Sequence, residues 1–486
     1  MSPPSPPPNK RKASTDKPIS PPPVKRKARS NISKGAVASF FTPTSQKPKD
    51  RTIWSERSPN ESDDIPATLL VARYEPETPP ASSSSSSSSP PPSKRRKIAA
   101  FDLDSTLITS ASGKKFASDP GDWKWWDAGV PTRLRALYHD EGYRVVILSN
   151  QAGLTLHPEA NANPKAPKNA GKAKVANFKQ KCGAVLTALD IPTTLYAATE
   201  RDGYRKPRTG MWDALREDYG IPLDEVDLAN SVFVGDAGGR IATLRDGATG
   251  KPATAKDFSC SDRNFARNVG IGYKTPEEFF LGEAPRDFAR EFDLAAYPYP
   301  DDDHGKVGEG GEGESKGRVV FEKKDERDVV LFCGPPGAGK STFYWTHLKP
   351  LGYARVNQDS LKSRAKCFKA AAECLDEGSS VAIDNTNPDP EGRREWIDFA
   401  KKRNLPIRCV WFKIPKALCE HNDAVRALNA SMNPESRTAL PGLAFTGYFS
   451  RLRPPATKEG FQDVVEVDFA FQGTREEYAV WGRYWA

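Results

Sequence analysis

The sequence has few cysteines and no long apolar stretch. Its seven cysteines are odd in number and include no Cys-x-x-Cys pair, which argues against a disulfide framework or a zinc finger and favours reduced thiols. No apolar run reaches the roughly 18 residues that a membrane span needs, so we expect no membrane segment. The first residues, MSPPSPPPNKRK, lack the apolar segment of a secretory signal. We therefore expect a nuclear or cytosolic protein.

Charge is concentrated in the N-terminal part. Residues 1–97 hold 18 Lys/Arg and 8 Asp/Glu, a net of +10, and the whole chain carries +9, so residues 98–486 sum to −1. The same segment is rich in Pro and Ser, and such a composition buries too little apolar surface to offset the entropy of ordering. We predict a disordered tail over 1–97. Its basic clusters at 10–12, 25–29 and 94–97 are either solvated linker charge or, as we favour, signals for localisation to the nucleus.

Val37, Phe40 and Phe41 form an apolar island in this tail. Their spacing resembles a sliding-clamp-binding box, although that box normally begins with Gln and has Ile, Leu or Met in place of Val37. Docking to a sliding clamp, docking to another partner and a chance arrangement all stay open.

After residue 97, short apolar segments alternate with helical stretches, which is typical of βαβ units and parallel sheets. The expected strands are Ile98–Leu103, Val145–Leu148, Ser231–Val234, Val329–Cys333, Val381–Ile383 and Cys409–Phe412. An acidic, Gly-rich segment, 298–318, separates two such patterns and is interpreted as a linker. We therefore predict an α/β protein with two domains, at 98–297 and 319–486. We also expect a monomer.

Two carboxylates follow the first expected strand, in the segment Phe101-Asp102-Leu103-Asp104-Ser105-Thr106. The carboxyl ends of parallel strands are where open α/β sheets bind their ligands. Asp102 is placed to attack a phosphate and form an aspartyl-phosphate, and Asp104 to protonate the leaving oxygen and then activate water. Two acids this close repel each other, which predicts Mg²⁺ between them.

Further groups for the same chemistry follow the next strands in order. Asp236, after the third strand, is expected to be another Mg²⁺ ligand. Ser149, Asn150 and Gln151, after the second strand, offer hydroxyl and amide groups to phosphate oxygens. Lys206 supplies a positive charge to the phosphate and to the nucleophile. The set resembles the haloacid-dehalogenase superfamily.

Three groups near these residues each have two interpretations. The acids Asp257 and Asp262 either support the metal or lie on the surface. The cluster of Trp123, Trp125 and Trp126 either packs in the core, which is favoured, or stacks on bases.

The third group is a basic loop that contains Lys165, Lys168, Lys172 and Lys174. This loop is either solvated or steers a nucleic-acid backbone.

A P-loop, GPPGAGKST, follows the strand expected at 329–333. Its glycines let backbone N–H groups wrap the phosphates of ATP at a helix N-terminus. Lys340 is expected to bridge the β- and γ-phosphates, and Ser341 to ligate Mg²⁺. The expected nucleotide-binding residues are Gly334, Gly337, Gly339, Lys340, Ser341 and Thr342.

P-loops occur in hydrolases as well as in kinases, so the residues that would face the phosphate acceptor must distinguish between these two classes of enzyme. Asp359, after the apolar segment 353–356, is placed to accept the proton of a hydroxyl nucleophile. Arg393 follows the segment Asp384-Asn385-Thr386-Asn387, and Arg426 lies in a polar helix from which it would reach over ATP. For each arginine alone, solvated helix charge is the favoured interpretation.

From about residue 98 to residue 471 the chain resembles the eukaryotic polynucleotide kinase 3′-phosphatases of DNA end repair. The matching segments include Asp122-Trp123, Asn150–Gly153, Arg205–Pro207, Gly210–Trp212, Phe233–Ala237, Lys256–Cys260, Thr275–Phe280, Asp384–Asp389 and Glu459–Phe461. The resemblance implies a haloacid-dehalogenase-like phosphatase followed by a P-loop kinase. Together they would remove 3′-phosphates and phosphorylate 5′-hydroxyls at DNA strand-break ends.

The resemblance also implies roles for single residues. Asp102 would be the nucleophile and Asp359 the general base that acts on a 5′-hydroxyl. Arg393 would hold DNA, and Arg426 would stabilise the transferred phosphate.

The chain departs from the family at several places. Ser105 stands where Gly is usual, Ser149 where Thr is common, and Ala424 where a second lid arginine is usual. Residues 1–97 cannot form the forkhead-associated domain of the animal members. A metabolite phosphatase/kinase fusion and a scaffold with degenerate sites are the alternatives. The tail and the intact acidic and P-loop residues count against them.

Overall fold

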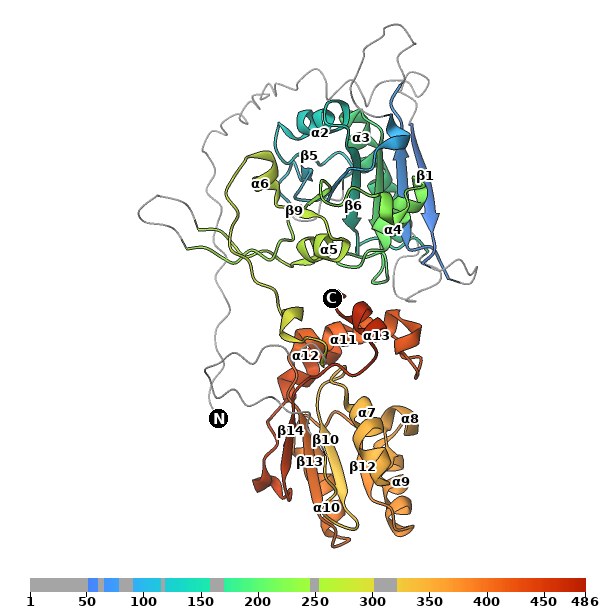
Figure 1. The fold of residues 1–486 in the computed structure, drawn as a ribbon, viewed down its shortest axis with the longest axis vertical. Helices are drawn as coiled ribbons and strands as arrows, with labels where there is room; N and C mark the ends of the chain where they lie inside the picture. The colour runs from blue at the N-terminus through green and yellow to red at the C-terminus, as the bar shows by residue number, and fades with distance from the viewer. Residues whose placement is uncertain are drawn as a thin grey trace, which may run out of the picture. The chain divides into compact units, whose positions relative to one another are not determined.

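The computed structural model describes residues 51–59, 65–77, 91–114, 119–157, 170–244, 253–300 and 321–486. Several predictions fall outside these residues: the island at Val37, Phe40 and Phe41, the basic clusters at 10–12 and 25–29, the lysines Lys165 and Lys168, and the linker from residue 301 to 318. The described residues form two main sheets flanked by helices (Figure 1). The predicted α/β class with two domains is confirmed.

The first sheet has seven strands in the order β1-β2-β7-β6-β3-β8-β9. The strands from β7 to β9 in that order are parallel, whereas β1 and β2 form an antiparallel pair that adds to β7. The strands are β1 (Thr52–Arg57), β2 (Leu69–Tyr74), β3 (Ile98–Phe101), β6 (Arg144–Asn150), β7 (Thr193–Ala198), β8 (Val232–Val234) and β9 (Gly272–Lys274). A small hairpin of β4 (Ile108–Thr109) and β5 (Lys124–Trp125) follows β3.

Strands β1 and β2 correct the prediction that residues 1–97 are disordered throughout. Leu69, Leu70 and Val71 are buried, and all six residues of β2 are paired with β7. A run of six residues with one charge is enough to extend an existing sheet. The Pro- and Ser-rich composition around LLVARY hid this run when the tail was judged as a whole. The sheet therefore begins at Thr52, ahead of the predicted boundary at 98.

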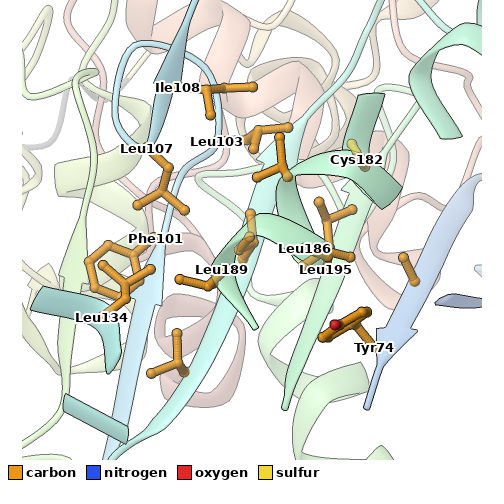
Figure 2. Close-up of a cluster of buried hydrophobic side chains, with 14 of the residues drawn as sticks. Tyr74, Phe101, Leu103, Leu107, Ile108, Leu134, Cys182, Leu186, Leu189 and Leu195 are labelled. Atoms are coloured by element: carbon orange, nitrogen blue, oxygen red, sulfur yellow. The ribbon is translucent and has the colours of Figure 1, made fainter. Parts of the chain in front are cut away.

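Alternate residues of β3 point to opposite faces of the first sheet, as strand geometry requires. Phe101 belongs to a buried cluster that includes Leu134 and Leu186, shown in Figure 2, whereas Ala100 belongs to a second cluster with Met211 and Phe265. Helices thus cover both faces. They are α2 (Val130–His139) and α3 (Ala170–Leu189) for the first cluster, and α4 (Gly210–Asp218) and α5 (Ser261–Val269) for the second; α6 (Pro276–Phe280) follows β9.

The second sheet has five parallel strands in the order β11-β12-β10-β13-β14. The strands are β10 (Val329–Cys333), β11 (Ala354–Val356), β12 (Val381–Ile383), β13 (Ile407–Phe412) and β14 (Val464–Val467). The helices are α7 (Lys340–Phe343), α8 (Gln358–Leu361), α9 (Arg364–Asp376), α10 (Pro390–Lys401), α11 (Lys416–Leu428), α12 (Gly442–Arg451) and α13 (Arg475–Trp481). The bounds predicted for β10 and β12 are confirmed. No helix among the described residues is long and apolar enough to cross a membrane.

Candidate active sites

Asp102 lies directly after β3 and is bound to a buried lysine. Its Oδ1 lies 2.7 Å from Lys206 Nζ, which also lies 2.9 Å from Asp262 Oδ1. Burial opposes the charge of Lys206, but attraction from Asp102 and Asp262 outweighs it and raises the pKa of the lysine. Lys206 is therefore a fixed cation beside the predicted nucleophile.

Three carboxylates converge at this point. Asp102, Asp236 and Asp262 each place an oxygen within 4.8 Å of the others. Burial, together with the neighbouring acids and against the pull of Lys206, raises the pKa of Asp102 to about 7. Burial and the charges of Asp102 and Asp262 raise that of Asp236 to about 8. Crowded carboxylates disfavour one another's charge, and their oxygens are hard ligands, so the cluster fits a divalent cation such as Mg²⁺.

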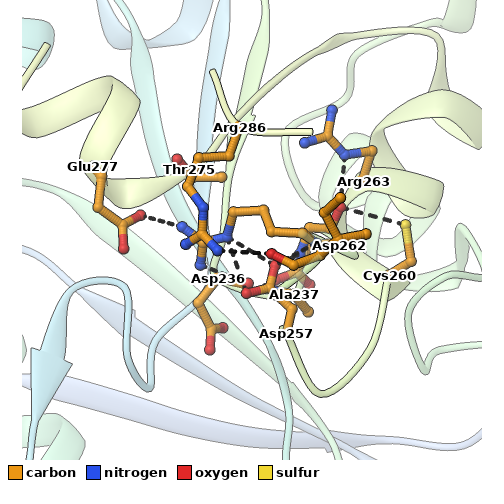
Figure 3. A network of polar contacts seen from close by, with 12 residues as sticks. Asp236, Ala237, Asp257, Cys260, Asp262, Arg263, Thr275, Glu277 and Arg286 are labelled. Atoms are coloured by element: carbon orange, nitrogen blue, oxygen red, sulfur yellow. Dashed lines mark hydrogen bonds and ion pairs between the residues drawn. The ribbon is translucent and has the colours of Figure 1, made fainter. Parts of the chain in front are cut away.

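Asp257 and Asp262, for which the sequence allowed either a metal-supporting or a surface position, differ in their contacts. Asp262 is part of the carboxylate cluster, and a side chain at position 235 would collide with it, so Gly235 permits its approach. Asp257, which is labelled in Figure 3, instead binds Arg240, with Nε–O distances of 2.9 and 3.0 Å, and accepts bonds from the N–H groups of Gly238 and Arg240. Arg240 also contacts the carbonyl oxygen of Asp236 at 3.3 Å. Asp257 therefore shapes the loop that carries Asp236.

Asp104 is held by two donors. Gln151 Nε2 donates to its Oδ2 at 2.6 Å, and Lys181 Nζ on α3 lies 3.2 Å from its Oδ1. Gln151 also donates to Ser149 Oγ at 3.0 Å. The predicted acid/base is thus oriented by one residue that the sequence singled out and by Lys181, which it did not.

Asn150 fixes the segment that carries Lys206. Its Oδ1 accepts the Lys206 N–H at 2.9 Å, and its Nδ2 donates to the Lys206 carbonyl oxygen at 3.0 Å. Asn150 thus positions the lysine, and because its Nδ2 has a second N–H, the predicted contact with phosphate stays a prediction.

Ser105 has a φ of +61°, in the left-handed region that favours glycine. This explains why the family resemblance expects Gly there, and serine tolerates the conformation at a cost of about 1–2 kcal/mol. The tryptophan interpretation favoured by the sequence agrees with the packing, because Trp123, Trp125 and Trp126 are partly buried against the core cluster of Phe101.

The predicted P-loop connects β10 to α7. Gly337 and Gly339 have φ of +73° and +82°, and a side chain at Gly337 would collide with the carbonyl of Cys419. Lys340 Nζ donates to the carbonyl oxygens of Gly334 and Pro335 at 3.0 and 2.6 Å. Burial lowers the pKa of this lysine. The loop thus holds the lysine that is predicted to bind phosphates against its own backbone.

Ser341 lies beside an acid from the neighbouring strand. Its Oγ donates to Asp384 Oδ2 at 2.9 Å, and Asp384 follows β12, the neighbour of β10. Arg355 of β11 contacts the same Asp384 oxygen at 2.6 Å and Ser341 Oγ at 2.8 Å. A hydroxyl and a carboxylate at this place fit the Mg²⁺ of a bound nucleotide.

Asp359 lies on α8 with its side chain 72% exposed. Asn357 caps this helix, accepting the Ser360 N–H at 3.2 Å and donating to the Asp384 carbonyl oxygen at 2.7 Å. Asp359 Oδ2 lies 3.1 Å from Arg437 Nη1. The predicted general base is thus accessible and is anchored to the strand end that carries Asp384.

Arg393 corrects a prediction. Its side chain is fully buried, with Nε and Nη2 bound to Glu459 at 2.8 and 2.7 Å and Nη1 bound to the carbonyls of Asn387 and Pro388. Because these donors are already satisfied inside the protein, Arg393 does not hold DNA directly. It fixes the loop after β12 instead.

Arg426 is engaged within its own helix. Its Nη2 lies 2.5 Å from Asp423 Oδ1, and the other oxygen of Asp423 accepts the Leu440 N–H. No described contact joins Arg426 to the P-loop, so its action on ATP stays a prediction.

Comparison with known proteins decides the family. The family model described as polynucleotide kinase 3 phosphatase matches residues 97–280, and an AAA domain model matches residues 329–455. The bifunctional polynucleotide phosphatase/kinase of Schizosaccharomyces pombe is 37% identical over 375 residues, covering 77% of this chain and 80% of that one. The chain belongs to the bifunctional polynucleotide phosphatase/kinase family. The first sheet is therefore the phosphatase and the second the kinase.

Two further matches cover smaller shares of this phosphatase/kinase. The polynucleotide 3′-phosphatase of Saccharomyces cerevisiae is 25% identical over 222 residues, covering 38% of this chain and 87% of that one. A gluconokinase of Sinorhizobium meliloti aligns with a TM-score of 0.23 and 16% identity, over 33% of this chain and 93% of that one.

Sequence patterns missed several residues at the two sites of the phosphatase/kinase. Lys181, Arg240, Arg355 and Arg437 contact predicted site residues or their loops, and Glu435 joins Arg355 to Arg437. None of them lies in a recognised motif. Only the tertiary fold brings them to the strand ends.

Proposed function

We propose that the protein heals DNA strand breaks by removing a 3′-phosphate through an aspartyl-phosphate on Asp102 and by phosphorylating the 5′-hydroxyl with ATP, so that the ends become substrates for ligation. The observation that carries the phosphatase half is the Asp102 carboxylate, set 2.7 Å from a buried lysine at the end of β3. The family, with a phosphatase and a kinase in one chain, supports the pairing of both activities.

In the phosphatase, an Asp102 oxygen attacks phosphorus, and the bond from phosphorus to the 3′-oxygen breaks. Asp104 gives its proton to that leaving oxygen, with Gln151 and Lys181 holding the carboxyl in place. Water then attacks the aspartyl-phosphate, Asp104 accepts the proton of that water, and phosphate leaves. Lys206 neutralises charge on the nucleophile and on the phosphate throughout.

Mg²⁺ fits the phosphatase cluster of Asp102, Asp236 and Asp262 because three crowded carboxylates share a single cation, Lys206. When bound, it offsets the charge of the phosphate and of the nucleophile. In the kinase, Ser341 and Asp384 would hold Mg²⁺ with ATP. Asp359 takes the proton of the 5′-hydroxyl, whose oxygen bonds to the γ-phosphorus as the bond to ADP breaks.

The test is a duplex with a single-nucleotide gap that carries a 3′-phosphate and a 5′-hydroxyl. With ATP and Mg²⁺, the wild-type protein is expected to convert both ends, which a denaturing gel resolves when each strand is labelled differently. Omitting ATP should stop only the 5′ reaction, and EDTA should stop both. A nucleoside 3′-monophosphate is the comparison substrate. Turnover of this small molecule as fast as that of DNA ends would overturn the proposal.

Metal binding to the phosphatase is expected to depend on pH. The folded pKa values of Asp102, about 7, and Asp236, about 8, lie above the ordinary 3.8. Without metal, the folded domain therefore binds more protons than the unfolded chain between about pH 4 and pH 8, and its stability falls as pH rises through that window. A cation relieves this loss, because metal competes with protons for the carboxylates.

Mg²⁺ should accordingly raise the melting temperature more at pH 8 than at pH 6. Differential scanning fluorimetry with Mg²⁺ and with EDTA measures the difference, and Asp236→Asn should shrink it. An equal shift at both pH values would contradict the assignment of the cluster as a metal site.

Nuclear localisation and docking to a sliding clamp through Val37, Phe40 and Phe41 are also proposals. They rest on the basic clusters and on the spacing of the aromatic residues. A monomeric state is also proposed.

A further inference from the structure

A chain of alternating charges crosses the kinase site and begins at the P-loop. Arg355 donates to Asp384 Oδ2 through Nε at 2.8 Å and contacts Ser341 Oγ through Nη2 at 2.8 Å. Its third nitrogen, Nη1, lies 2.9 Å from Glu435 Oε1. Arg355 is mostly buried, with 14% of its side chain exposed, so these contacts are only partly screened by water. Arg355 therefore connects Ser341 of the P-loop to Glu435.

Glu435 also contacts a second arginine, Arg437. Its Oε2 lies 2.7 Å from Arg437 Nε and 2.5 Å from Arg437 Nη2. Asn433 closes a turn around this segment, because its Oδ1 accepts the Arg437 N–H at 2.9 Å and its Nδ2 donates to the Arg437 carbonyl oxygen at 2.8 Å. Both the backbone and one edge of the Arg437 guanidinium are thus fixed.

At the far end of this series of ion pairs, Arg437 contacts Asp359, the proposed general base. Arg437 Nη1 lies 3.1 Å from Asp359 Oδ2. Burial lowers the pKa of the P-loop Lys340, and the positive charge of Arg437 adds to this effect. Through Glu435 and Arg355 the guanidinium is linked to Ser341 of the P-loop, and it lies beside the group that would activate the acceptor. Its side chain is 28% exposed, which leaves it accessible to a ligand.

This position differs from that of Arg426. The Arg426 guanidinium pairs with Asp423 in the same helix, and Asp423 also holds the backbone of Leu440. Among the described residues, Arg437 is joined to both predicted halves of the kinase site, whereas Arg426 is joined to neither.

We propose that Arg437 is a catalytic residue of the kinase that donates hydrogen bonds to the phosphoryl group in transfer, and that Glu435 and Arg355 are its positioning residues. This rests on the proposed 5′-kinase function. As the 5′-oxygen bonds to the γ-phosphorus and the bond to the ADP oxygen breaks, negative charge is spread over the equatorial oxygens, which a planar guanidinium matches. Asp359 gains the proton of the hydroxyl in the same step. Its loss of charge weakens its hold on Arg437 Nη1 just as the phosphoryl oxygens need a donor.

The test compares Arg437→Met, Arg437→Lys and a matched control, Arg403→Met. Arg403 follows α10 before β13 begins, at the sheet edge opposite the P-loop, and its guanidinium lies over Phe399. Phosphorylation of a 5′-hydroxyl oligonucleotide gives kcat. Calorimetric titration gives the Kd for ATP and, separately, for ADP with aluminium fluoride, which mimics the phosphoryl group in transfer.

Arg437→Met should lower kcat by about 10²–10³-fold, the usual effect of removing one donor to a transition state. The Kd for ATP should stay within about threefold of wild type, because the contact is made only during transfer. The Kd for ADP with aluminium fluoride should weaken by about 10²-fold. Arg437→Lys, which keeps the charge but loses the fork, should recover part of kcat. Arg403→Met should match wild type in every measurement.

An unchanged kcat in Arg437→Met would overturn the proposal. So would a lower kcat with wild-type affinity for ADP and aluminium fluoride, because Arg437 would then act only on the structure of the loop. An equal loss of affinity for ATP and for the mimic would overturn it as well, since that contact would belong to the ground state. If the wild-type protein binds ATP but phosphorylates no 5′-hydroxyl end, the proposed kinase function itself fails, which is a distinct result.

Discussion

Asp102→Asn is expected to abolish 3′-dephosphorylation of the gapped duplex while 5′-phosphorylation of the same molecule proceeds at the wild-type rate. Asparagine keeps the shape of the side chain but cannot form the aspartyl-phosphate. Loss of a nucleophile typically lowers turnover by about 10⁵-fold or more. Rapid-quench experiments with a labelled 3′-phosphate should trap label on the wild-type protein and none on this variant.

Loss of folding does not explain such a result. Burial and the neighbouring acids disfavour the charge of Asp102, whose pKa is raised to about 7, and Lys206 keeps Asp262 as a partner at 2.9 Å. The melting temperature of Asp102→Asn in EDTA at pH 8 should therefore not fall below that of wild type. Asp224→Asn, at an exposed position, is the control. Residual dephosphorylation within tenfold of wild type would show that another group attacks the phosphate.

The sequence predicted the parts of both sites that depend on strand order. Asp102, Ser149 and Asp236 follow or end three strands that are neighbours in the sheet, so their proximity follows from parallel pairing alone. The P-loop was predicted in the same way, at the end of β10, whereas the role of Asp384 at the end of the neighbouring β12 was not predicted. These residues lie in compact motifs, and a parallel sheet has little freedom in where it places them.

The predictions that failed depended on tertiary contacts. The family resemblance implied that Arg393 holds DNA, but a contact with Glu459, 66 residues later in the chain, engages its guanidinium inside the protein. Strand β2 was lost in a Pro- and Ser-rich context, although its pairing with β7 overrides that local composition.

Residues outside motifs were beyond the reach of pattern analysis for a related reason. Lys181 lies on a long helix among other lysines, and only the packing of α3 brings its Nζ to within 3.2 Å of Asp104. Arg437 lies in an irregular segment with no periodicity. The role proposed for it depends on contacts with Glu435 and Asp359 that no spacing along the chain indicates.

Lys340→Met is expected to have the opposite effect to Asp102→Asn. It should abolish 5′-phosphorylation and leave 3′-dephosphorylation intact. Lys340 Nζ now donates to the carbonyl oxygens of Gly334 and Pro335, and its charge is buried. Bound phosphates would replace those weak partners with full negative charges. Removing a cation at a transferring phosphoryl group typically costs about 10³-fold or more in kcat. Methionine keeps most of the volume, so the fold of the loop should persist.

The control for this variant is Lys349→Met, which removes an exposed lysine outside the P-loop. It should leave both reactions unchanged. Gel analysis of the gapped duplex reports both ends from one sample, so a general loss of protein lowers both signals, whereas loss of one site lowers only one. If Lys340→Met lost 3′-dephosphorylation as well, the two chemistries would share a site or depend on each other. The separate sheets, each with its own acids and its own cation, lead us to expect that they do not.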